Sequence, residues 1–216
     1  MKTKLTLALV LYIVFSQLVI CQIAIDSTQI KREYSNLNEA LKNPEKVYRL
    51  NLSNQNIKLP KETWSKFINL EYLSFKNDHL KEIPKEIALL KNLKVLDLSG
   101  NDFKTLPISF SELSNLEELF LNDEKNMILY DNIEIISLLP HLRVLHLEND
   151  NLSNLPKNIF KLTNLESLFL NHNNFKQIPK GINGLDHLQY LDLNDNKIKP
   201  ELQDLKNLNF GFKINF

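Results

Sequence analysis

Hydrophobic residues recur along most of the chain in one fixed pattern, a six-residue motif of the form LxxLxL. The motif occurs seven times, and its copies begin at Val47, Leu70, Leu93, Leu116, Leu142, Leu165 and Leu188. The spacing is 23 residues at every step except between the fourth and fifth copies, where it is 26. A period of this length indicates a repeat protein in which each unit is one short supersecondary structure.

Each copy predicts a strand followed by a short helical turn. In LxxLxL the fourth and sixth positions alternate with variable ones, as in a half-buried strand, so they should face the core. Most copies continue to a Leu-Pro or Ile-Pro pair and two apolar residues three positions apart, such as Ile83-Pro84 with Ile87 and Leu90. This arrangement is typical of a helical turn packed on a core. One unit cannot bury its own apolar stripe, so we expect stacked units that share a continuous core.

These copies resemble the leucine-rich repeat family in its 23-residue bacterial form, LxxLxLxxNxLxxLPxxIxxLxNL, over residues 47–208. The resemblance implies an α/β solenoid of about seven repeats. In such a horseshoe the parallel strands line the concave face and the short helical turns form the convex face. Similar proteins act in adhesion and host contact.

The ninth position of the repeat departs from the family pattern in several copies. Asparagine is usual there, because its amide both donates to and accepts from the backbone of neighbouring turns. Asparagine is present as Asn101, Asn173 and Asn196, whereas the other copies have Gln55, Asp78, Glu124 and Asp150. An ionised carboxylate only accepts, so we expect looser or more hydrated turns at the acidic positions.

Both ends of the stack need a cover over their apolar residues. Residues 22–46 predict an N-terminal segment and a helical cap, with residues 22–33 disordered or loosely attached. The cap helix should start at Asn36, with Glu39 completing a capping box and Pro44 ending the helix. Residues 209–216 alternate phenylalanine or isoleucine with polar residues or glycine, which predicts a C-terminal capping strand.

Residues 1–21 have the layout of a secretory signal peptide, with two lysines before an apolar stretch from Leu5 to Ile20. The stretch is shorter than the ~20 residues that a spanning helix needs, and an uncleaved anchor is the alternative. Cleavage is expected after Cys21, although Leu18-Val19-Ile20-Cys21 also resembles a bacterial lipobox with Ile20 in place of a small residue. The chain is therefore predicted to be exported, as a secreted, periplasmic or cell-surface protein. It would contact a membrane only through a lipidated Cys21 or a retained signal.

Composition narrows the range of functions. The 216 residues include 26 Lys+Arg and 26 Asp+Glu, so the basic footprint of a nucleic-acid-binding protein is lacking. A single cysteine excludes an internal disulfide and a cysteine-based zinc site. No HExxH motif or glycine-rich phosphate loop is found, and His146 and His172 occupy different positions of neighbouring repeats. We therefore predict no enzyme activity, no cofactor and no metal site.

The third and fifth positions of each strand should point out of the concave face. Phe120, His146 and Phe169 occupy the fifth position of consecutive copies and are predicted to lie side by side. The other candidate partner-binding residues on this face are Tyr72, Val95, Asp97, Val144, Tyr190 and Asp192. An aromatic row with a charged rim is typical of a protein-binding hot spot. Aromatic residues on strands also serve β-propensity and cross-strand packing, and this alternative stays open.

The fourth copy is longer by three residues, within the segment KNMILYDN at 125–132. This segment puts apolar residues where the other copies have a polar loop. Part of it could supply a displaced core position. Alternatively, it forms a protruding loop that contacts a partner through Met127, Ile128 and Tyr130.

Taken together, these features predict a non-enzymatic, monomeric recognition protein that binds a protein partner through its concave face. The alternative is a structural or self-associating component of a cell envelope. The sequence does not identify the partner, because a repeat fold determines the shape of a surface and not what it binds.

Overall fold

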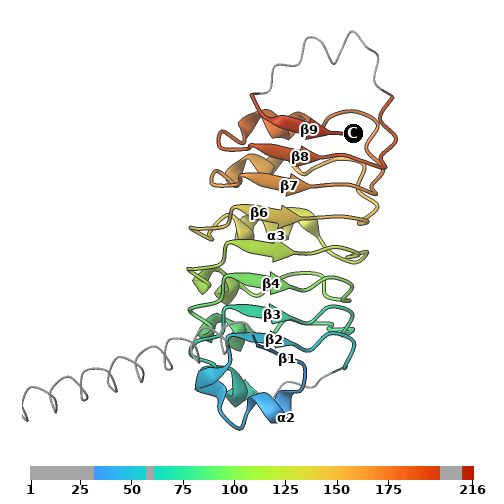
Figure 1. The fold of residues 1–216 in the computed structure, drawn as a ribbon. Helices are drawn as coiled ribbons and strands as arrows, with labels where there is room; N and C mark the ends of the chain where they lie inside the picture. Colours follow the sequence, from blue (N-terminus) through green and yellow to red (C-terminus); the bar gives the residue numbers. More distant parts are fainter. Residues whose placement is uncertain (1–31, 57–60, 200–210) are drawn as a thin grey trace, which may run out of the picture.

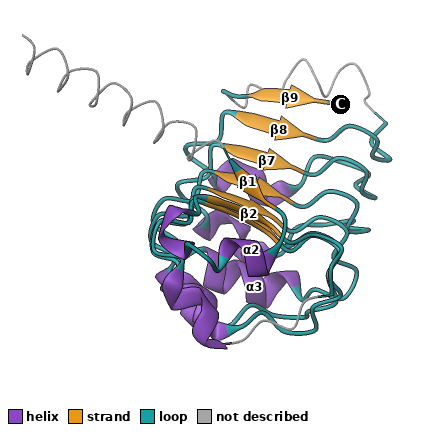
Figure 2. Ribbon diagram, turned by 60° about the horizontal axis from the view of Figure 1, so that its bottom comes forward, coloured by secondary structure: helices purple, strands orange, loops and turns teal. Residues whose placement is uncertain are grey.

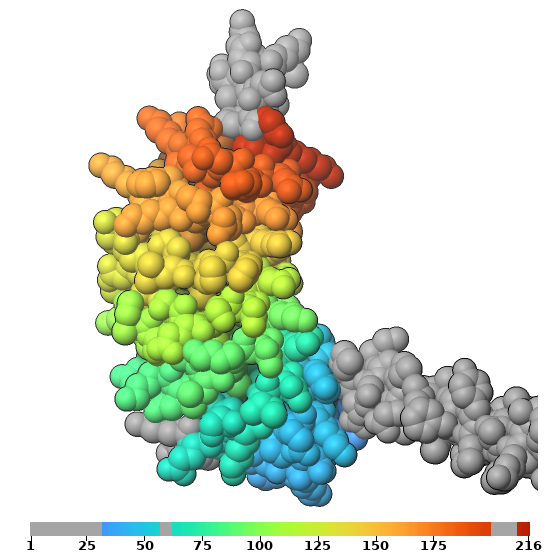
Figure 3. Space-filling view, turned by 90° about the vertical axis from the view of Figure 1, so that its left-hand side faces the viewer, coloured from blue at the N-terminus to red at the C-terminus, as the bar shows by residue number. Residues whose placement is uncertain are grey.

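The computed structural model describes residues 32–56, 61–199 and 211–216. Nine parallel strands form one open sheet in sequence order (Figure 1). Each strand pairs with the next in a register that advances by one repeat, so that Leu50, Leu73 and Leu96 are successive partners. The predicted solenoid is confirmed, and its turns follow one another as layers along the molecule (Figure 3).

The strands are β1 (Glu33–Tyr34), β2 (Arg49–Asn51), β3 (Tyr72–Ser74), β4 (Val95–Asp97), β5 (Glu118–Phe120), β6 (Val144–His146), β7 (Ser167–Phe169), β8 (Tyr190–Asp192) and β9 (Lys213–Asn215). The helical elements are α2 (Leu37–Ala40), η1 (Pro44–Lys46), η2 (Lys61–Lys66), η3 (Lys85–Leu89), η4 (Ile108–Glu112), α3 (Leu129–Ile136), η5 (Lys157–Lys161) and η6 (Lys180–Gly184). Those labelled η are 3₁₀ turns. Figure 2 shows the helical elements on one side of the solenoid, behind the sheet.

The core lies between the sheet and the helical turns. The fourth-position leucine of every repeat is completely buried: Leu50, Leu73, Leu96, Leu119, Leu145, Leu168 and Leu191 each have 0% exposure. From the helical side, Ile87 and Leu90 complete the core of one turn, as the proline-based pattern predicts. Burial of each such side chain contributes about 1.5–3 kcal/mol to the free energy of unfolding. Each turn buries its leucines partly against the neighbouring turns, so the turns stabilise one another.

The turn that follows each strand has a fixed backbone conformation at the eighth position. Its φ angle lies between 53° and 70° in all seven repeats, at Asn54, Asn77, Gly100, Asp123, Asn149, His172 and Asp195. Among L-residues, Asn and Asp tolerate this left-handed region best. The eighth position is therefore restricted by the backbone, although its side chains lie outside the core.

The ninth position forms a continuous hydrogen-bonded ladder through the middle of the solenoid. The backbone N–H of Asn101 donates to Glu124 Oε1 at 2.9 Å, that of Glu124 to Asp150 Oδ1 at 2.7 Å, and that of Asp150 to Asn173 Oδ1 at 3.1 Å. Glu124 and Asp150 are 2% and 7% exposed. The expectation of looser turns is wrong here, because the acids accept the same backbone hydrogen bond that an asparagine oxygen accepts. The expectation of more hydrated turns stays a prediction.

These buried acids lack what the asparagine amide supplies. The Asn173 amide nitrogen donates to the carbonyls of Leu147 and Leu170, at 2.7 and 3.0 Å. At the equivalent place, Glu124 Oε2 and Asp150 Oδ2 have no hydrogen-bond partner among the described residues. Burial, with smaller contributions from nearby acids, raises the pKa of Glu124 to about 8 and that of Asp150 to about 7. Below about pH 7 the neutral carboxylic acid is thus the favoured form of both, and it carries an O–H in place of the amide N–H.

At the N-terminal end, α2 begins after Asn36, whose side-chain oxygen accepts the backbone N–H of Glu39 at 3.1 Å. The helix ends at Ala40, and Pro44 opens η1 instead of ending α2. Glu33 was expected in a loosely attached segment, but it pairs with β2 in strand β1. At the other end, β9 extends the sheet beyond the seventh repeat. Residues 1–21, with Cys21, lie outside the described residues.

The long fourth repeat accommodates its extra residues as a true α-helix, α3, in place of a 3₁₀ turn. Leu129 is buried at the start of the helix, and Met127 packs against the core. Ile128 and Tyr130 are 45% and 53% exposed. The segment therefore supplies a core position, as the first of the two alternatives expected, and α3 takes the place of the alternative protruding loop: Met127 is not a free contact residue.

Candidate binding site on the concave face

A stack of rings occupies the centre of the concave face. Phe120, His146 and Phe169 are consecutive partners in β5, β6 and β7. The imidazole ring lies 3.9 Å from the Phe120 ring and 4.3 Å from the Phe169 ring, with interplanar angles of 13° and 5°. The predicted side-by-side arrangement is confirmed. Tyr190 extends it, with its ring 5.4 Å from Phe169 and tilted by 52°. We call these four residues the aromatic row.

His146 is held in the row by two acids. Its Nε2 lies 3.0 Å from Glu118 Oε1, and its Nδ1 lies 3.2 Å from Glu148 Oε2. A carboxylate oxygen accepts a hydrogen bond, so a ring nitrogen of His146 that carries a proton donates to the acid beside it. The hydrogen bond from His146 is the main cause that lowers the pKa of the Glu148 carboxyl. The planar imidazole thus lies stacked between two phenyl rings, an arrangement that stabilises aromatic groups beyond the area they bury.

Glu148 is itself positioned by the preceding turn. The Asn122 side chain donates to Glu148 Oε2 at 2.7 Å and accepts the Glu148 backbone N–H at 2.8 Å. Sequence reasoning missed Glu118, Glu148 and Asn122. Their signal is the spacing: Glu148 follows His146 by two positions on the same face, and Glu118 lies on the adjacent strand.

The predicted contact residues therefore differ in how much of their side chains a partner could reach. His146 is only 8% exposed, because the flanking rings and acids cover it. It supports the row more than it presents a surface, whereas Phe120 and Phe169 are half-buried on the open face. Val95 and Val144 are half-buried at the third position of their strands.

Tyr190 and Tyr72 lie toward opposite ends of the face, each beneath a cation of this chain. The Tyr190 hydroxyl donates to Asp192 at 3.2 Å, and the Lys213 ammonium lies 5.7 Å from its ring centre. The Arg49 guanidinium lies 4.0 Å from the ring centre of Tyr72. Burial raises the pKa of Tyr72, as do, to a smaller extent, Glu33 and Asp97. Tyr72 and Asp97 thus do not join the row itself, although Asp97 pairs with Phe120 across the sheet.

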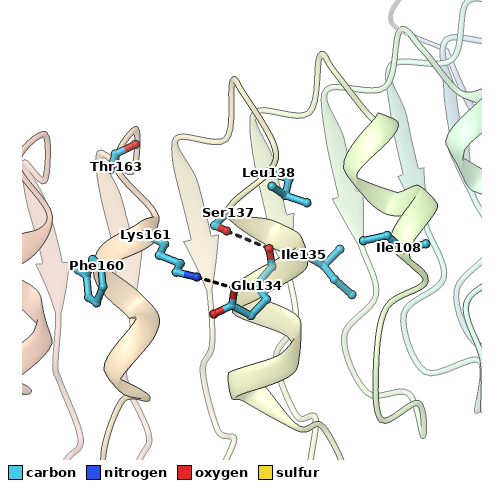
Figure 4. A pocket seen from close by; sticks show the side chains of 8 residues that line it. All are labelled: Ile108, Glu134, Ile135, Ser137, Leu138, Phe160, Lys161 and Thr163. Atoms are coloured by element: carbon cyan, nitrogen blue, oxygen red, sulfur yellow. Dashed lines mark hydrogen bonds and ion pairs between the residues drawn. The ribbon is translucent and has the colours of Figure 1, made fainter.

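A second surface feature lies on the convex side, where sequence reasoning proposed none. Ile108, Leu138 and Phe160 are 71%, 55% and 51% exposed around a shallow pocket between η4, α3 and η5 (Figure 4). Lys161 Nζ reaches Glu134 Oε2 across it at 2.6 Å, and this bond lowers the pKa of Glu134. The signal was Ile108, which follows Pro107 where the equivalent repeats have Lys85, Lys157 and Lys180.

Catalytic or metal chemistry finds no support in the part of the chain that the structure describes. No group of three or more His, Cys, Asp or Glu side chains there could hold a metal ion. His172 and Asp195, a pair 3.5 Å apart, lie at eighth positions of neighbouring turns. No helix within residues 32–56, 61–199 and 211–216 is long and apolar enough to cross a membrane.

Two family models match the chain: a leucine-rich repeat region over residues 46–134 and a leucine-rich repeat over residues 140–198. A comparison with curated proteins finds no match.

Solved structures include several similar solenoids. A leucine-rich repeat protein of Leptospira interrogans is 31% identical, with a TM-score of 0.61, over 81% of this chain and 50% of that one. The receptor TLR13, solved in complex with single-stranded RNA, is 30% identical, with a TM-score of 0.61, over 81% of this chain and 25% of that one. Human trophoblast glycoprotein 5T4 is 25% identical, with a TM-score of 0.65, over 79% of this chain and 69% of that one. The chain thus spans half the length of the Leptospira protein. With its nine-stranded open sheet, its 23-residue period and these matches, the chain belongs to the leucine-rich repeat family.

Proposed function

We propose that this chain is an exported, non-enzymatic recognition protein that binds a protein partner through its concave face. Leucine-rich repeat folds are interaction scaffolds, which supports recognition in general. One observation favours the concave face: the stack of Phe120, His146 and Phe169, with His146 held between Glu118 and Glu148. Rigid aromatic groups bind at low entropic cost, and pre-organised rings near the centre of a surface are typical of hot spots.

A nucleic-acid partner is the alternative that the TLR13 complex raises, because that receptor was solved with RNA. The chemistry of the concave face disfavours it here. From β4 to β8 the third, fifth and seventh positions include four carboxylates, Asp97, Glu118, Glu148 and Asp192, and no lysine or arginine. A phosphate backbone needs cationic side chains, so this face favours a protein partner.

The binding proposal is tested by capturing partner proteins on the wild-type chain and on two variants. The full chain and a Phe120→Ala/Phe169→Ala variant would be immobilised and exposed to extracts of candidate host and bacterial surfaces. Leu89→Ala is the matched control, because Leu89 is 49% exposed on the opposite, helical side. The proposal predicts a defined protein that wild type and Leu89→Ala retain and the double variant loses. Equal retention by all three chains would exclude the aromatic row as the binding site.

Export and surface location are part of the same proposal, with adhesion or host contact as the role. They rest on the signal-like layout of residues 1–21. Mass spectrometry of the chain expressed in a bacterium distinguishes three outcomes. Cleavage after Cys21 gives a secreted or periplasmic protein, a lipid on Cys21 gives an anchored one, and an intact N-terminus contradicts cleavage of the signal.

Self-association in an envelope is the second candidate, and the exposed convex residues Ile108, Leu138 and Phe160 favour it. Sedimentation at several concentrations separates the two. A monomer throughout supports recognition. A concentration-dependent dimer that Leu138→Ser abolishes supports self-association.

A further inference from the structure

The acidic residues on the concave face are not matched by basic residues on the same face. The whole chain is neutral, with 26 basic and 26 acidic residues. Basic side chains flank the five strands β4 to β8 at the second position, as Lys94 and Arg143. Both are already paired with glutamates, Lys94 with Glu71 at 3.2 Å and Arg143 with Glu166 at 3.7 Å. Glu118 and Glu148 both contact the ring of His146. The surface that remains is aromatic and acidic.

The two phenylalanine rings that enclose His146 differ in what lies on their outer sides. Beyond Phe169 lies the tilted Tyr190 ring, and the Tyr190 hydroxyl donates to Asp192. Phe120 has the imidazole on one face, while on the other side its partner in the sheet is the short side chain of Asp97. Neighbouring strands are about 4.8 Å apart, so the Asp97 carboxylate lies beside the half-buried ring of Phe120.

Asp97 is fixed in this place by its own turn. Its Oδ1 accepts the backbone N–H of Ser99 at 2.9 Å, and its Oδ2 is reached by the Ser74 hydroxyl at 3.4 Å. These donors are neutral, so the carboxylate has no cationic partner among the described residues. Because Asp97 is half-buried, a salt bridge formed here would be less screened than one in open solvent.

Other aromatic rings on the concave face are covered by planar nitrogen-bearing side chains of this chain. Arg49 covers Tyr72 at 4.0 Å, and the imidazole of His146 covers Phe120 and Phe169. Planar nitrogen-bearing groups over rings are thus a recurrent contact on this face, and Arg49 is a cation of this kind. Phe120 is half-buried, and no cation of the described residues lies over its ring.

We propose that the partner is a basic protein segment that places an arginine side chain over Phe120 and pairs it with Asp97. This inference rests on the proposed binding function of the concave face. A planar guanidinium stacks on a ring and forks onto a carboxylate at once, which the compact ammonium of lysine does less well.

The test measures binding of capped deca-arginine, deca-lysine and deca-glutamate peptides to the full chain by isothermal titration at 0.15 M salt. Deca-arginine is expected to bind, deca-lysine to bind more weakly and deca-glutamate not at all. Asp97→Asn and Phe120→Leu should each weaken deca-arginine binding by about threefold or more. Asp186→Asn and Leu89→Ala change charge and apolar size on the helical side, and both should leave binding unchanged.

Several results would overturn the inference: no binding of deca-arginine, equal binding of deca-lysine, or unchanged binding by Asp97→Asn and Phe120→Leu. Thermal unfolding of each variant identifies losses caused by misfolding, and intermolecular nuclear Overhauser effects between arginine side-chain protons and the Phe120 ring test the contact in wild type. The proposed function fails separately. The Phe120→Ala/Phe169→Ala variant could lose its protein partner while Asp97→Asn leaves the affinity for deca-arginine unchanged. That combination would contradict only the inference that the partner is basic.

Discussion

The carboxyl group of Asp150 accepts the backbone N–H of Glu124 at 2.7 Å, in a buried position that an asparagine occupies in the most regular turns. The Glu124 carboxyl does the same for Asn101 at 2.9 Å. Two acids are thus stacked inside the solenoid. Their second oxygens are without partners in the described structure, which makes this part of the ladder sensitive to protonation.

Stability should fall as the pH rises from about 4 to about 8. The ordinary pKa values are 4.5 for Glu124 and 3.8 for Asp150, and burial raises them to about 8 and about 7 in the folded chain. Between the two sets of values the folded state binds more protons than the unfolded state, so deprotonation favours unfolding. Urea unfolding across this range would measure the slope.

A Glu124→Gln/Asp150→Asn variant should remove most of that slope. The amide cannot ionise, and it supplies donors for the carbonyls that the asparagine ladder uses elsewhere. At pH 8 the variant should be more stable than wild type by about 1–3 kcal/mol. Asp186→Asn is the control for an exposed charge and should keep the wild-type slope. An unchanged slope in the ladder variant would show that these acids ionise without cost.

His146 should matter for folding more than its place on a binding face suggests. His146→Phe keeps a ring in the stack but leaves Glu118 and Glu148 without their shared donor. Since removing one partner of a buried polar set costs about 1–3 kcal/mol, we expect a destabilisation of that size in urea unfolding. A triple variant that also has Glu118→Gln and Glu148→Gln should recover part of it. Unaltered stability of His146→Phe would mean that the two hydrogen bonds contribute nothing.

The repeat register was predictable from sequence because it depends only on leucine spacing. A 23-residue period places every fourth-position leucine beside the next, and Leu96 and Leu119 pair accordingly. The row of Phe120, His146 and Phe169 follows from the same register. The contacts of His146 with Glu118 and Glu148 do not follow from it. Glu118 reaches His146 diagonally from another strand, and this contact depends on side-chain conformation.

The ladder was mispredicted for a different reason. Asp150 was treated as a fixed anion, whereas burial raises its pKa to about 7, and its Oδ1 accepts the backbone hydrogen bond that an asparagine oxygen accepts in other turns. Strand β9 lies within the capping strand expected at residues 209–216, and its pairing with β8 keeps the 23-residue spacing. Strand β1 was harder to assign, because it has two residues and takes its conformation from the edge of an existing sheet.

Truncation of the aromatic row should separate binding from folding. Phe120→Ala/Phe169→Ala removes two half-buried rings, while the neighbouring leucines Leu119 and Leu168 stay fully buried. If the rings form a hot spot, partner binding weakens by about 2 kcal/mol or more and the melting temperature changes little. The alternative, that the rings serve cross-strand packing, predicts the reverse: a clear loss of melting temperature with retained affinity.

Replacement of Gly100 tests the backbone restriction at the eighth position. Its φ is +70°, and an added Cβ would clash with Asn77 Oδ1, at the movable end of an exposed side chain. The main cost of a side chain here is therefore the left-handed backbone, about 1–2 kcal/mol for a typical L-residue. Gly100→Val should lose at least that much in thermal or urea unfolding. Gly100→Asn should lose much less, because asparagine adopts this conformation at Asn54, Asn77 and Asn149. Equal losses for both variants would assign the cost to crowding against Asn77, and Gly100→Val combined with Asn77→Gly would then restore stability.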